Sequence, residues 1–419
     1  MKSETAKKCD NIVPLFTDSA WRTYDLPYGE KARFTVAEDG QRATIKTTSD
    51  YGLGKWICTV QVDGGAFYDF SAACKTELDE CDAFLIITQY DAHGRMPIRE
   101  HVKDTVRDGE YLRFFDKLDI TEKTVRIDIE LWAKGKGAFA VWERPTLVLS
   151  EPLPENKVKI AAVQMKWDGE IGATEESRKH EYLKLADEAG AKGADLIVFG
   201  EGLYSGGIGL SLPVRARERD EKMLGFLSEK AIEHNMYIVF NGVEEDGDHY
   251  YNTSFIIDRK GRTVGKYRKT HITVVEYEEG YTPGEGFPVF DLDFGRIGIL
   301  ICYDQFFPET AKALARKGAE IICISTAGDD SHACMSLAMD SGVYLAVAGM
   351  NKENNFGWGP TRVVDPLGNL ISHTDKNLTL AFAEVDLNKK VRRFWMSTGS
   401  AQSTVHDDYR YEVNPHSFM

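Results

Sequence analysis

Residues 1–152 alternate apolar and polar side chains over short stretches that are separated by glycine, aspartate and lysine. The clearest example is the stretch 124–131 (TVRIDIEL), in which every second residue is apolar. This alternation is typical of a strand with one buried face, and similar strands are predicted at 55–62, 84–90 and 139–142. Short strands at this spacing predict an all-β domain, a jelly-roll-like sandwich of two sheets.

A different pattern begins after residues 151–156, a charged stretch with two prolines that we expect to be a linker. From residue 153 to 395, apolar runs alternate with amphipathic stretches, as in α/β domains. The apolar runs predict strands at 158–163, 194–199, 237–240, 253–257, 297–301, 321–324, 344–347 and 380–383. Helices are predicted from the N-cap Thr174 to about residue 191, from 217 to 235, and from Pro308 to about residue 317. Residues 396–419 have little periodicity, and we expect a tail that packs at a subunit interface.

Composition and charge narrow the class of protein. Hydrophobic residues make up 42% and charged residues 28% of the 419 residues, as in soluble globular proteins. A net charge of −15 argues against binding to nucleic acid. We expect neither a membrane span nor an export signal, because the chain has no apolar run of sufficient length. The seven cysteines are odd in number and irregularly spaced, which favours reduced thiols in the cytoplasm.

Three segments of the α/β region place reactive side chains after predicted strands. Glu201 follows the strand at 194–199, Lys269 lies in GKYRKTH (265–271), and Cys302 ends the strand at 297–301. Each residue alone would be ordinary, since a cysteine at the end of an apolar strand is usually a small buried hydrophobe. Strand ends of open α/β sheets converge on one edge, however, where ligands bind. Together the three side chains supply a general base, a positive charge and a nucleophile, and the Tyr303 N–H could be a second oxyanion donor.

These segments resemble the nitrilase superfamily, the carbon–nitrogen hydrolases with a Glu–Lys–Cys triad. The most specific part is GILICYDQFFPE (298–309), and Lys269-x-His271 and Thr282-Pro-Gly284 also fit. The resemblance covers about residues 157 to 395 and implies a four-layer αββα sandwich. It also implies a thioester mechanism with Glu201 as general base, Lys269 as oxyanion stabiliser and Cys302 as nucleophile. It implies no cofactor and no metal, and a homodimer or larger homo-oligomer.

Many members of that family use a second glutamate after the lysine. The candidates here are Glu276, Glu278 and Glu279; the spacing from the lysine favours Glu276, with Glu278 close behind. We therefore expect Glu276 to be the second active-site carboxylate. Glu278 and the aromatic side chains of Tyr303 and Phe306 are expected to contact the substrate.

The chain departs from the family pattern in three places. Gly200 replaces the usual proline before the glutamate, and residues 337–341 (LAMDS) replace a helix motif that is informative about substrate in relatives. Cys302 is followed by Tyr-Asp rather than the Trp-Glu common in true nitrilases. The last difference favours a small amide or N-carbamoyl amine as the substrate over a nitrile, which stays the alternative.

The sequence is compatible with three other functions. A metal hydrolase could use His271, His332 and Cys334, but no pair of ligands has the spacing of a metal motif. A Cys–His dyad of Cys302 with one of these histidines is chemically sensible, yet it leaves Glu201 and Lys269 without a role. A glycan- or protein-binding sandwich fused to a silent second domain is the third. Its aromatic residues, including Trp21, Trp56, Tyr68, Trp132 and Trp142, are more often core residues than binding platforms, so we expect an accessory role.

Overall fold

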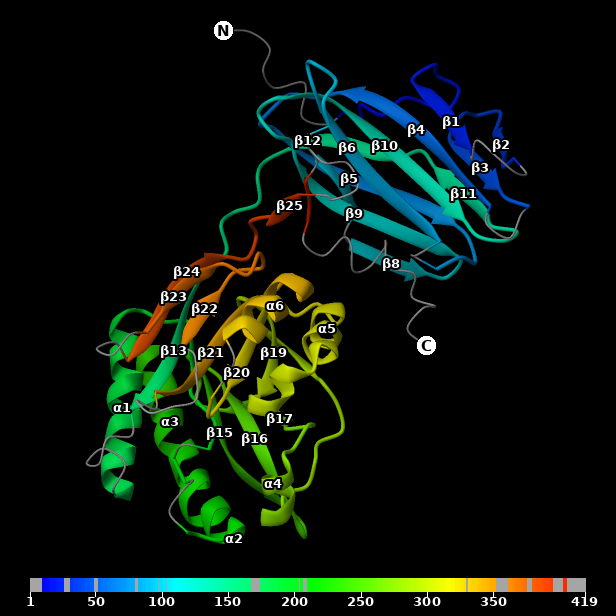
Figure 1. The fold of residues 1–419 in the computed structure, drawn as a ribbon. Helices are drawn as coiled ribbons and strands as arrows, with labels where there is room; N and C mark the ends of the chain where they lie inside the picture. The colour runs from blue at the N-terminus through cyan, green and yellow to red at the C-terminus, as the bar shows by residue number, and fades with distance from the viewer. Residues whose placement is uncertain are drawn as a thin grey trace, which may run out of the picture. The chain divides into compact units, whose positions relative to one another are not determined.

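The computed structural model describes residues 10–25, 31–48, 52–79, 82–96, 98–102, 104–166, 174–202, 204–205, 209–328, 331–351, 361–374, 379–394 and 402–404. The chain forms two compact units (Figure 1). One unit contains the residues up to Pro154 together with those from Lys390 onward, and the other runs from Glu155 to Lys389. The first boundary between the units falls inside the predicted linker at 151–156.

The first unit is a β-sandwich. One sheet has the strand order β1-β4-β10-β6-β7-β26-β25, and the other has the order β2-β3-β11-β5-β9-β8 with β12 paired to β5. The first sheet contains β1 (Trp21–Asp25), β4 (Leu53–Gln61), β6 (Ala83–Asp91), β7 (Ile98–His101), β10 (Thr124–Lys134), β25 (Arg392–Phe394) and β26 (Gln402–Thr404). The second contains β2 (Arg33–Val36), β3 (Arg42–Lys46), β5 (Phe67–Lys75), β8 (Asp104–Asp108), β9 (Tyr111–Asp119), β11 (Phe139–Glu143) and β12 (Thr146–Ser150).

The core of the sandwich follows from the alternation seen in the sequence. On β10, Ile127, Ile129 and Leu131 are fully buried in a cluster that takes residues from both sheets. Four of the five aromatic residues weighed above belong to this core, as predicted: Trp21, Trp56, Tyr68 and Trp142. Trp132 is the exception, because it lies on the opposite face of β10 and packs against Phe84 and Ile86. Alternate residues of a strand point to opposite faces, which accounts for both positions.

The chain returns to the sandwich after the α/β unit. Lys390 Nζ lies 3.1 Å from both carboxylate oxygens of Asp116, and Arg392 Nε donates to Glu100 at 3.0 Å. Within the predicted tail, β26 joins β25 and pairs with β7 at Ile98. The change of unit therefore lies at Lys390, before the predicted boundary at 395. The described part of the tail pairs within its own chain, and most of 396–419 lies outside the described residues.

The second unit is a mixed α/β unit, in agreement with the predicted class. Its strands have the order β17-β16-β15-β14-β13-β21-β20-β19-β18, with β22 and β23 attached to β21 and β24 to β13. The strands are β13 (Lys157–Lys166), β14 (Leu196–Val198), β15 (Tyr237–Asp246), β16 (His249–Ile257), β17 (Thr263–Arg268), β18 (Val289–Leu292), β19 (Gly295–Ile301), β20 (Ile321–Ser325), β21 (Tyr344–Asn351), β22 (Arg362–Val364), β23 (Leu370–His373) and β24 (Leu380–Asp386). The helices are α1 (Glu175–Ala191), α2 (Leu212–Val214), α3 (Glu221–His234), α4 (Val274–Glu279), α5 (Pro308–Arg316) and α6 (Ser331–Ser341), with a π-helical turn η1 (Arg215–Asp220) and a 3-10 turn η2 (Cys302–Phe306).

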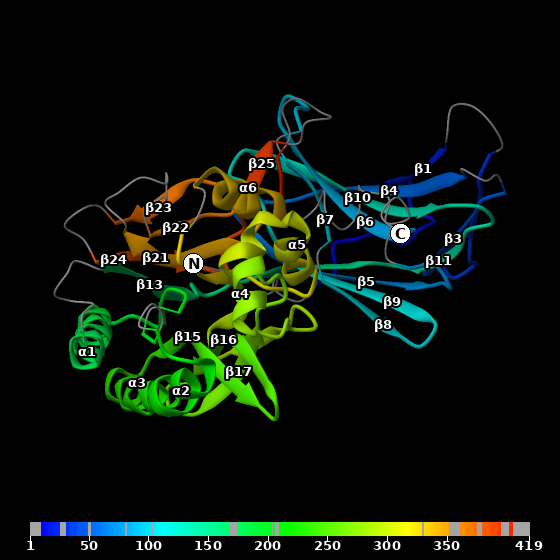
Figure 2. The same cartoon turned by 60° about the horizontal axis from the view of Figure 1, so that its bottom comes forward.

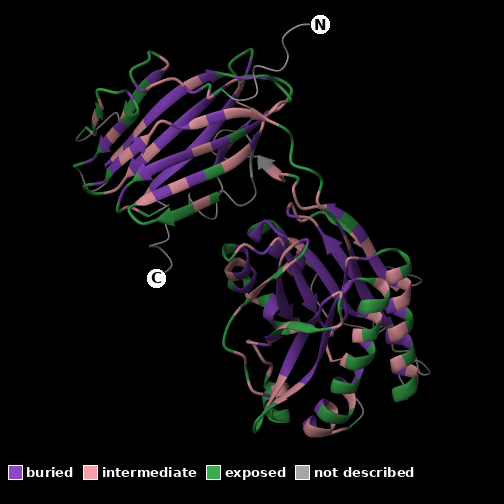
Figure 3. Ribbon diagram, turned by 180° about the vertical axis from the view of Figure 1, so that it is seen from behind, coloured by how far each residue is buried: buried purple, intermediate pink, exposed green. Residues whose placement is uncertain are grey.

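The three largest buried clusters of this unit connect its helices and strands. One cluster joins α1 and α3 to strands that include β13, β14 and β15, and a second joins α5 and α6 to β19, β20 and β21. The third contains apolar residues of both strand groups, from β13 through β21. Figure 2 shows α1 and α3 grouped together, apart from α5 and α6. The central strands are buried along almost their whole length (Figure 3), which explains why the sequence shows them as continuous apolar runs.

Several helix boundaries agree with the sequence. Thr174 caps α1 by accepting a hydrogen bond from the Ser177 N–H at 3.1 Å, and Pro308 begins α5. The helix predicted from 217 to 235 begins instead as the π-helical turn η1 and becomes α-helical at Glu221. The short helix α4 was not predicted. None of the helices in the described parts of the chain combines the length and the apolar character needed to span a lipid bilayer.

Candidate active site

Three loops of the α/β unit bring Glu201, Lys269 and Cys302 into one cavity of about 320 Å³. Glu201 follows β14, Lys269 follows β17, and Cys302 follows β19. All three are among the residues that line the cavity: Glu201, Gly202, Arg215, Asn241, Gly242, Asn252, Lys269, Thr273, Glu276, Glu279, Tyr281, Cys302 and Ala327. A cavity of this size suits a small molecule.

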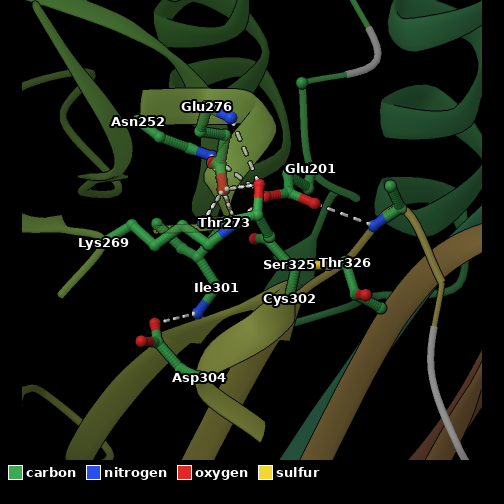
Figure 4. Close-up of polar contacts among 12 residues, drawn as sticks. Glu201, Asn252, Lys269, Thr273, Glu276, Ile301, Cys302, Asp304, Ser325 and Thr326 are labelled. Atoms are coloured by element: carbon green, nitrogen blue, oxygen red, sulfur yellow. Dashed lines mark hydrogen bonds and ion pairs between the residues drawn. The ribbon is translucent and has the colours of Figure 1, made fainter. Parts of the chain in front are cut away.

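Lys269 is the centre of the polar network (Figure 4). Its Nζ donates to Glu201 Oε1 at 2.8 Å and to the two carboxylate oxygens of Glu276 at 2.9 and 2.8 Å. The side chain is only 1% exposed. Burial disfavours the ammonium, but the nearby carboxylates of Glu201 and Glu276 outweigh burial and raise the pKa of Lys269 well above its ordinary value. Lys269 is therefore a fixed positive charge beside the cysteine.

Glu276 is held in its ionised form. Burial would raise the pKa of this carboxyl, but the Lys269 ammonium and the hydrogen bonds that Glu276 accepts together lower it. Two of these hydrogen bonds come from the Thr273 N–H at 2.8 Å and from Asn252 Nδ2 at 2.7 Å. The group is thus suited to holding Lys269 in place rather than to carrying a proton.

Cys302 occupies a strained position at the start of η2. Its φ is +43°, in the left-handed region that residues other than glycine rarely adopt. The backbone turns sharply there, so the thiol faces the cavity instead of continuing the strand. Burial and the Glu201 carboxylate raise the pKa of this thiol to about 12, and the Lys269 charge opposes the shift. The resting cysteine is therefore protonated at neutral pH and needs a base when it attacks.

A buried carboxylate fixes the turn behind the cysteine. Asp304 is fully buried; its Oδ2 accepts hydrogen bonds from the Ile301 N–H at 2.9 Å and from the Tyr267 hydroxyl at 2.7 Å. Its Oδ1 lies 3.0 Å from the backbone nitrogen of His271 and 2.9 Å from the ring Nδ1. The His271 ring also stacks on Phe307, with 4.0 Å between ring centroids. His271 is thus engaged with Asp304 and does not line the cavity, which leaves the Cys–His dyad without support from this residue.

Two asparagines complete the network and were missed from the sequence. Asn252 Nδ2 donates to Glu201 Oε1 at 2.9 Å as well as to Glu276, so it bridges the two carboxylates. Asn241 donates to Asn252 Oδ1 at 2.9 Å and accepts from the Gly202 N–H at 2.6 Å. Both side chains are buried on the paired strands β15 and β16. A polar amide within a mostly apolar strand is the signal that could have identified them.

The structure separates the three other predicted contact residues from the cavity. Glu278 is exposed, and the side chains of Tyr303 and Phe306 lie at the surface beside each other. The side chain of none of the three lines the cavity. The sequence placed them near the substrate because they neighbour Glu276 and Cys302, but neighbouring residues of a helical turn point in different directions.

The metal-hydrolase alternative is not supported by the positions of its proposed ligands among the described residues. Cys334 is buried and contacts Gln305 Oε1 at 3.3 Å, and the His332 side chain lies outside the described residues. A grouping of possible metal ligands does occur elsewhere, at Asp187, Glu233 and His234 on α1 and α3. Lys230 already lies 2.6 Å from Asp187 and 2.8 Å from Glu233. The Lys230 ammonium therefore already pairs with both carboxylates.

Comparison with known proteins identifies the family of the second unit. A family profile described as carbon–nitrogen hydrolase matches residues 159–392, more than half of the chain. A nitrilase from Pyrococcus abyssi is 39% identical over 145 residues, which are 33% of this chain and 54% of that protein, so the chain spans about half of its length. An omega-amidase from Xenopus laevis is 30% identical over 223 residues, 49% of this chain and 81% of that protein.

Among solved structures, an amidase from Nesterenkonia sp. aligns with 57% of this chain and 93% of its own, at 21% identity and a TM-score of 0.49. The chain belongs to the carbon–nitrogen hydrolase family, in its amidase-like branch. It is accordingly a hydrolase of carbon–nitrogen bonds other than peptide bonds.

Proposed function

We propose that this protein hydrolyses an amide or an N-carbamoyl amine through a thioester on Cys302. Glu201 is the general base, Lys269 stabilises the oxyanion, and Glu276 holds Lys269 in position. The observation that carries the proposal is the pair of hydrogen bonds from Lys269 Nζ to Glu201 and Glu276, in the cavity that Cys302 also lines.

The first half of the reaction forms the thioester. Glu201 takes the proton from the Cys302 thiol as Sγ attacks the carbonyl carbon of the substrate. The negative charge that develops on the carbonyl oxygen is stabilised by the Lys269 ammonium and by the Tyr303 N–H. The tetrahedral intermediate then collapses, the carbon–nitrogen bond breaks, and protonated Glu201 returns the proton to the leaving nitrogen.

The second half consumes water. Glu201, again ionised, takes a proton from a water molecule that attacks the thioester carbonyl. The carbon–sulfur bond breaks, the proton returns to Sγ, and the acid leaves. One amide and one water thus give one acid and one ammonia or amine, and the enzyme regains its starting protonation state.

Nitrile hydrolysis by the same residues is the second candidate. The similarity to a protein named nitrilase favours it, and a nitrile carbon can be attacked by the same thiol. The cavity itself does not separate the two substrates, since the attacking and stabilising groups are shared.

The test is ammonia release over a panel of small amides, ureido acids and nitriles. Amides or ureido acids should be turned over, and C302A and E201Q should each lower kcat by at least about a thousandfold. C323A is the matched control, because Cys323 is buried on β20 outside the cavity, and it should keep wild-type turnover. Turnover of nitriles alone would favour the second candidate, and full activity in C302A would refute both.

We also propose a layered arrangement, an assembly and a location. The three clusters described above support the four-layer αββα order expected from the resemblance. Exposed apolar side chains on α4 and η2, namely Val274, Val275, Tyr277 and Phe306, support assembly into a homo-oligomer. The five described cysteines are free thiols, as expected in the cytoplasm. For the sandwich we propose an accessory role without catalytic residues.

A further inference from the structure

Arg215 is a charged residue in the cavity for which the proposed chemistry has no use. It is the first residue of η1 and lines the same cavity as Cys302. Its side chain is only 12% exposed. A guanidinium stays charged at all working pH values and carries five N–H donors. Holding such a group at the wall of a cavity is costly unless its donors find acceptors.

The protein fixes one edge of this guanidinium. Arg215 Nε donates to Ser205 Oγ at 3.2 Å, and Ser205 Oγ donates to Asp220 Oδ2 at 2.7 Å. Asp220 is buried and accepts a further hydrogen bond from the Val243 N–H at 2.8 Å. The orientation of Arg215 is thus set through Ser205 by a buried carboxylate that Arg215 does not itself contact.

Among the residues that the structure describes, neither terminal amino group of Arg215 donates a hydrogen bond to the protein. Among the described residues their acidic neighbour is Glu279, whose carboxylate lies 3.9 Å from Nη1, beyond hydrogen-bond distance. The Glu279 side chain is 52% exposed, so the pair is a weak, solvent-screened one. Lys269, the other cation of the cavity, is already paired with two carboxylates, those of Glu201 and Glu276. Arg215 is therefore the cation of the described lining whose charge no carboxylate within hydrogen-bond distance balances.

We infer that Arg215 binds a carboxylate at the end of the substrate opposite the scissile bond. A guanidinium presents two parallel N–H donors that match the two oxygens of a carboxylate. The substrates are then monoamides of dicarboxylic acids or N-carbamoyl amino acids, whose far carboxylate pairs with Arg215 while the amide or carbamoyl carbonyl faces Cys302. This inference rests on the proposed function and narrows its substrate class.

The test compares substrates that differ only in the charge of the tail. Glutaramate has an anionic tail, pentanamide a neutral one and 5-aminopentanamide a cationic one, and succinamate and malonamate vary the length. The best anionic amide should exceed pentanamide in kcat/KM by about 10- to 100-fold, the range for a hydrogen-bonded charge. In R215Q this ratio should fall toward one, mainly through KM, and R215K should restore part of it.

R217Q is the matched control. Arg217 belongs to the same turn, but its side chain is 66% exposed, pairs with Glu245 and does not line the cavity. R217Q should keep the wild-type ratio. A wild-type enzyme that prefers pentanamide or the cationic amide, or an R215Q variant that keeps the wild-type ratio, would overturn the inference.

Equilibrium binding separates this inference from the proposed hydrolysis. The C302A variant cannot form the thioester, so calorimetry with glutaramate and with succinamate measures the subsite alone. Adding R215Q to C302A should weaken the tighter of the two interactions by about tenfold or more. Binding that does not depend on Arg215 contradicts the subsite even in an active enzyme. Binding that depends on Arg215 in a wild-type protein that turns over no amide would support the subsite and refute only the proposed reaction.

Discussion

At the scale of single residues, two opposed charges influence the protonation of the Cys302 thiol. Burial and the nearby Glu201 carboxylate favour the protonated thiol, and the Lys269 ammonium favours the thiolate. The carboxylate dominates the lysine because Lys269 also shares its charge with Glu276. The active site therefore keeps its nucleophile neutral until a carbonyl substrate arrives, and Glu201 can then accept the proton in the same step as the attack.

The E201Q variant tests this balance. Replacing the carboxylate by an amide removes the negative charge but leaves Lys269, so the pKa of Cys302 should fall below its wild-type value of about 12. E201Q should thus lose amide turnover and yet react faster with methyl methanethiosulfonate at pH 8 than the wild type does. Labelling followed by mass spectrometry across the alkaline range measures the shift, and C302A gives the background. A reaction profile for E201Q that lies at higher pH than the wild-type profile would refute the assigned electrostatics.

At the scale of elements, the short helix α4 positions the Glu276 carboxylate that binds Lys269. It has six residues, none of them buried, so packing contributes little to its stability. A reciprocal cap replaces packing: Thr273 Oγ1 accepts from the Glu276 N–H at 3.3 Å, while Glu276 Oε2 accepts from the Thr273 N–H at 2.8 Å. The same Glu276 carboxylate binds Lys269. Forming the helix and positioning the lysine are consequently one event.

Removing the Thr273 hydroxyl should therefore affect catalysis as well as the helix. A cap of this kind contributes about 0.5–2 kcal/mol, so T273A should lower kcat/KM by about 2- to 30-fold, mostly in kcat. T273S keeps the hydroxyl and should restore most of the loss. Steady-state kinetics on an accepted amide measures both variants. Equal kinetics in T273A and the wild type would show that Glu276 is positioned without the cap.

At the scale of the whole molecule, the chain leaves the sandwich, forms the α/β unit and returns. The return is fixed by charges in the sandwich, because Lys390 and Arg392 contact Glu100, Asp116 and Asp119. Burial opposes the ionisation of Glu100, but the two cations outweigh it and lower the pKa of Glu100 to about 2. Burial instead raises the pKa of Asp116 to about 6, despite Lys390. The sandwich therefore requires residues from both ends of the sequence.

R392Q should destabilise the sandwich, because it leaves the buried Glu100 with one cation. Breaking a buried ion pair from one side costs about 3–5 kcal/mol, whereas R113Q, at an exposed pair with Asp108, should change stability by less than about 0.5 kcal/mol. Urea unfolding at pH 7 compares the variants. If R392Q and R113Q lower the free energy of unfolding equally, the ion pairs of Arg392 do not stabilise the sandwich.

The stability of the sandwich should also depend on pH. The stabilisation due to ionised Glu100 is present above its ordinary pKa of 4.5 and is lost as the pH falls through about 2. The contribution of Asp116 to stability depends on pH in the opposite direction. Because its pKa is raised in the folded protein, Asp116 reduces stability as the pH rises from 3.8 through about 6.

Local pattern and tertiary structure decided different parts of this protein. The alternation at 124–131, the buried runs of the α/β region and the cap at Thr174 could be predicted, because they depend on residues close together in sequence. That Glu201, Lys269 and Cys302 lie close together could also be predicted, because each follows a strand and strand ends converge on one edge. For the second carboxylate the spacing only favoured Glu276 over Glu278 and Glu279, because successive residues of α4 point in directions about 100° apart and packing decides which one meets Lys269. Asn252, Arg215 and the returning strands β25 and β26 depend on pairing and contact between distant segments, and distances of that kind exist only in the folded chain.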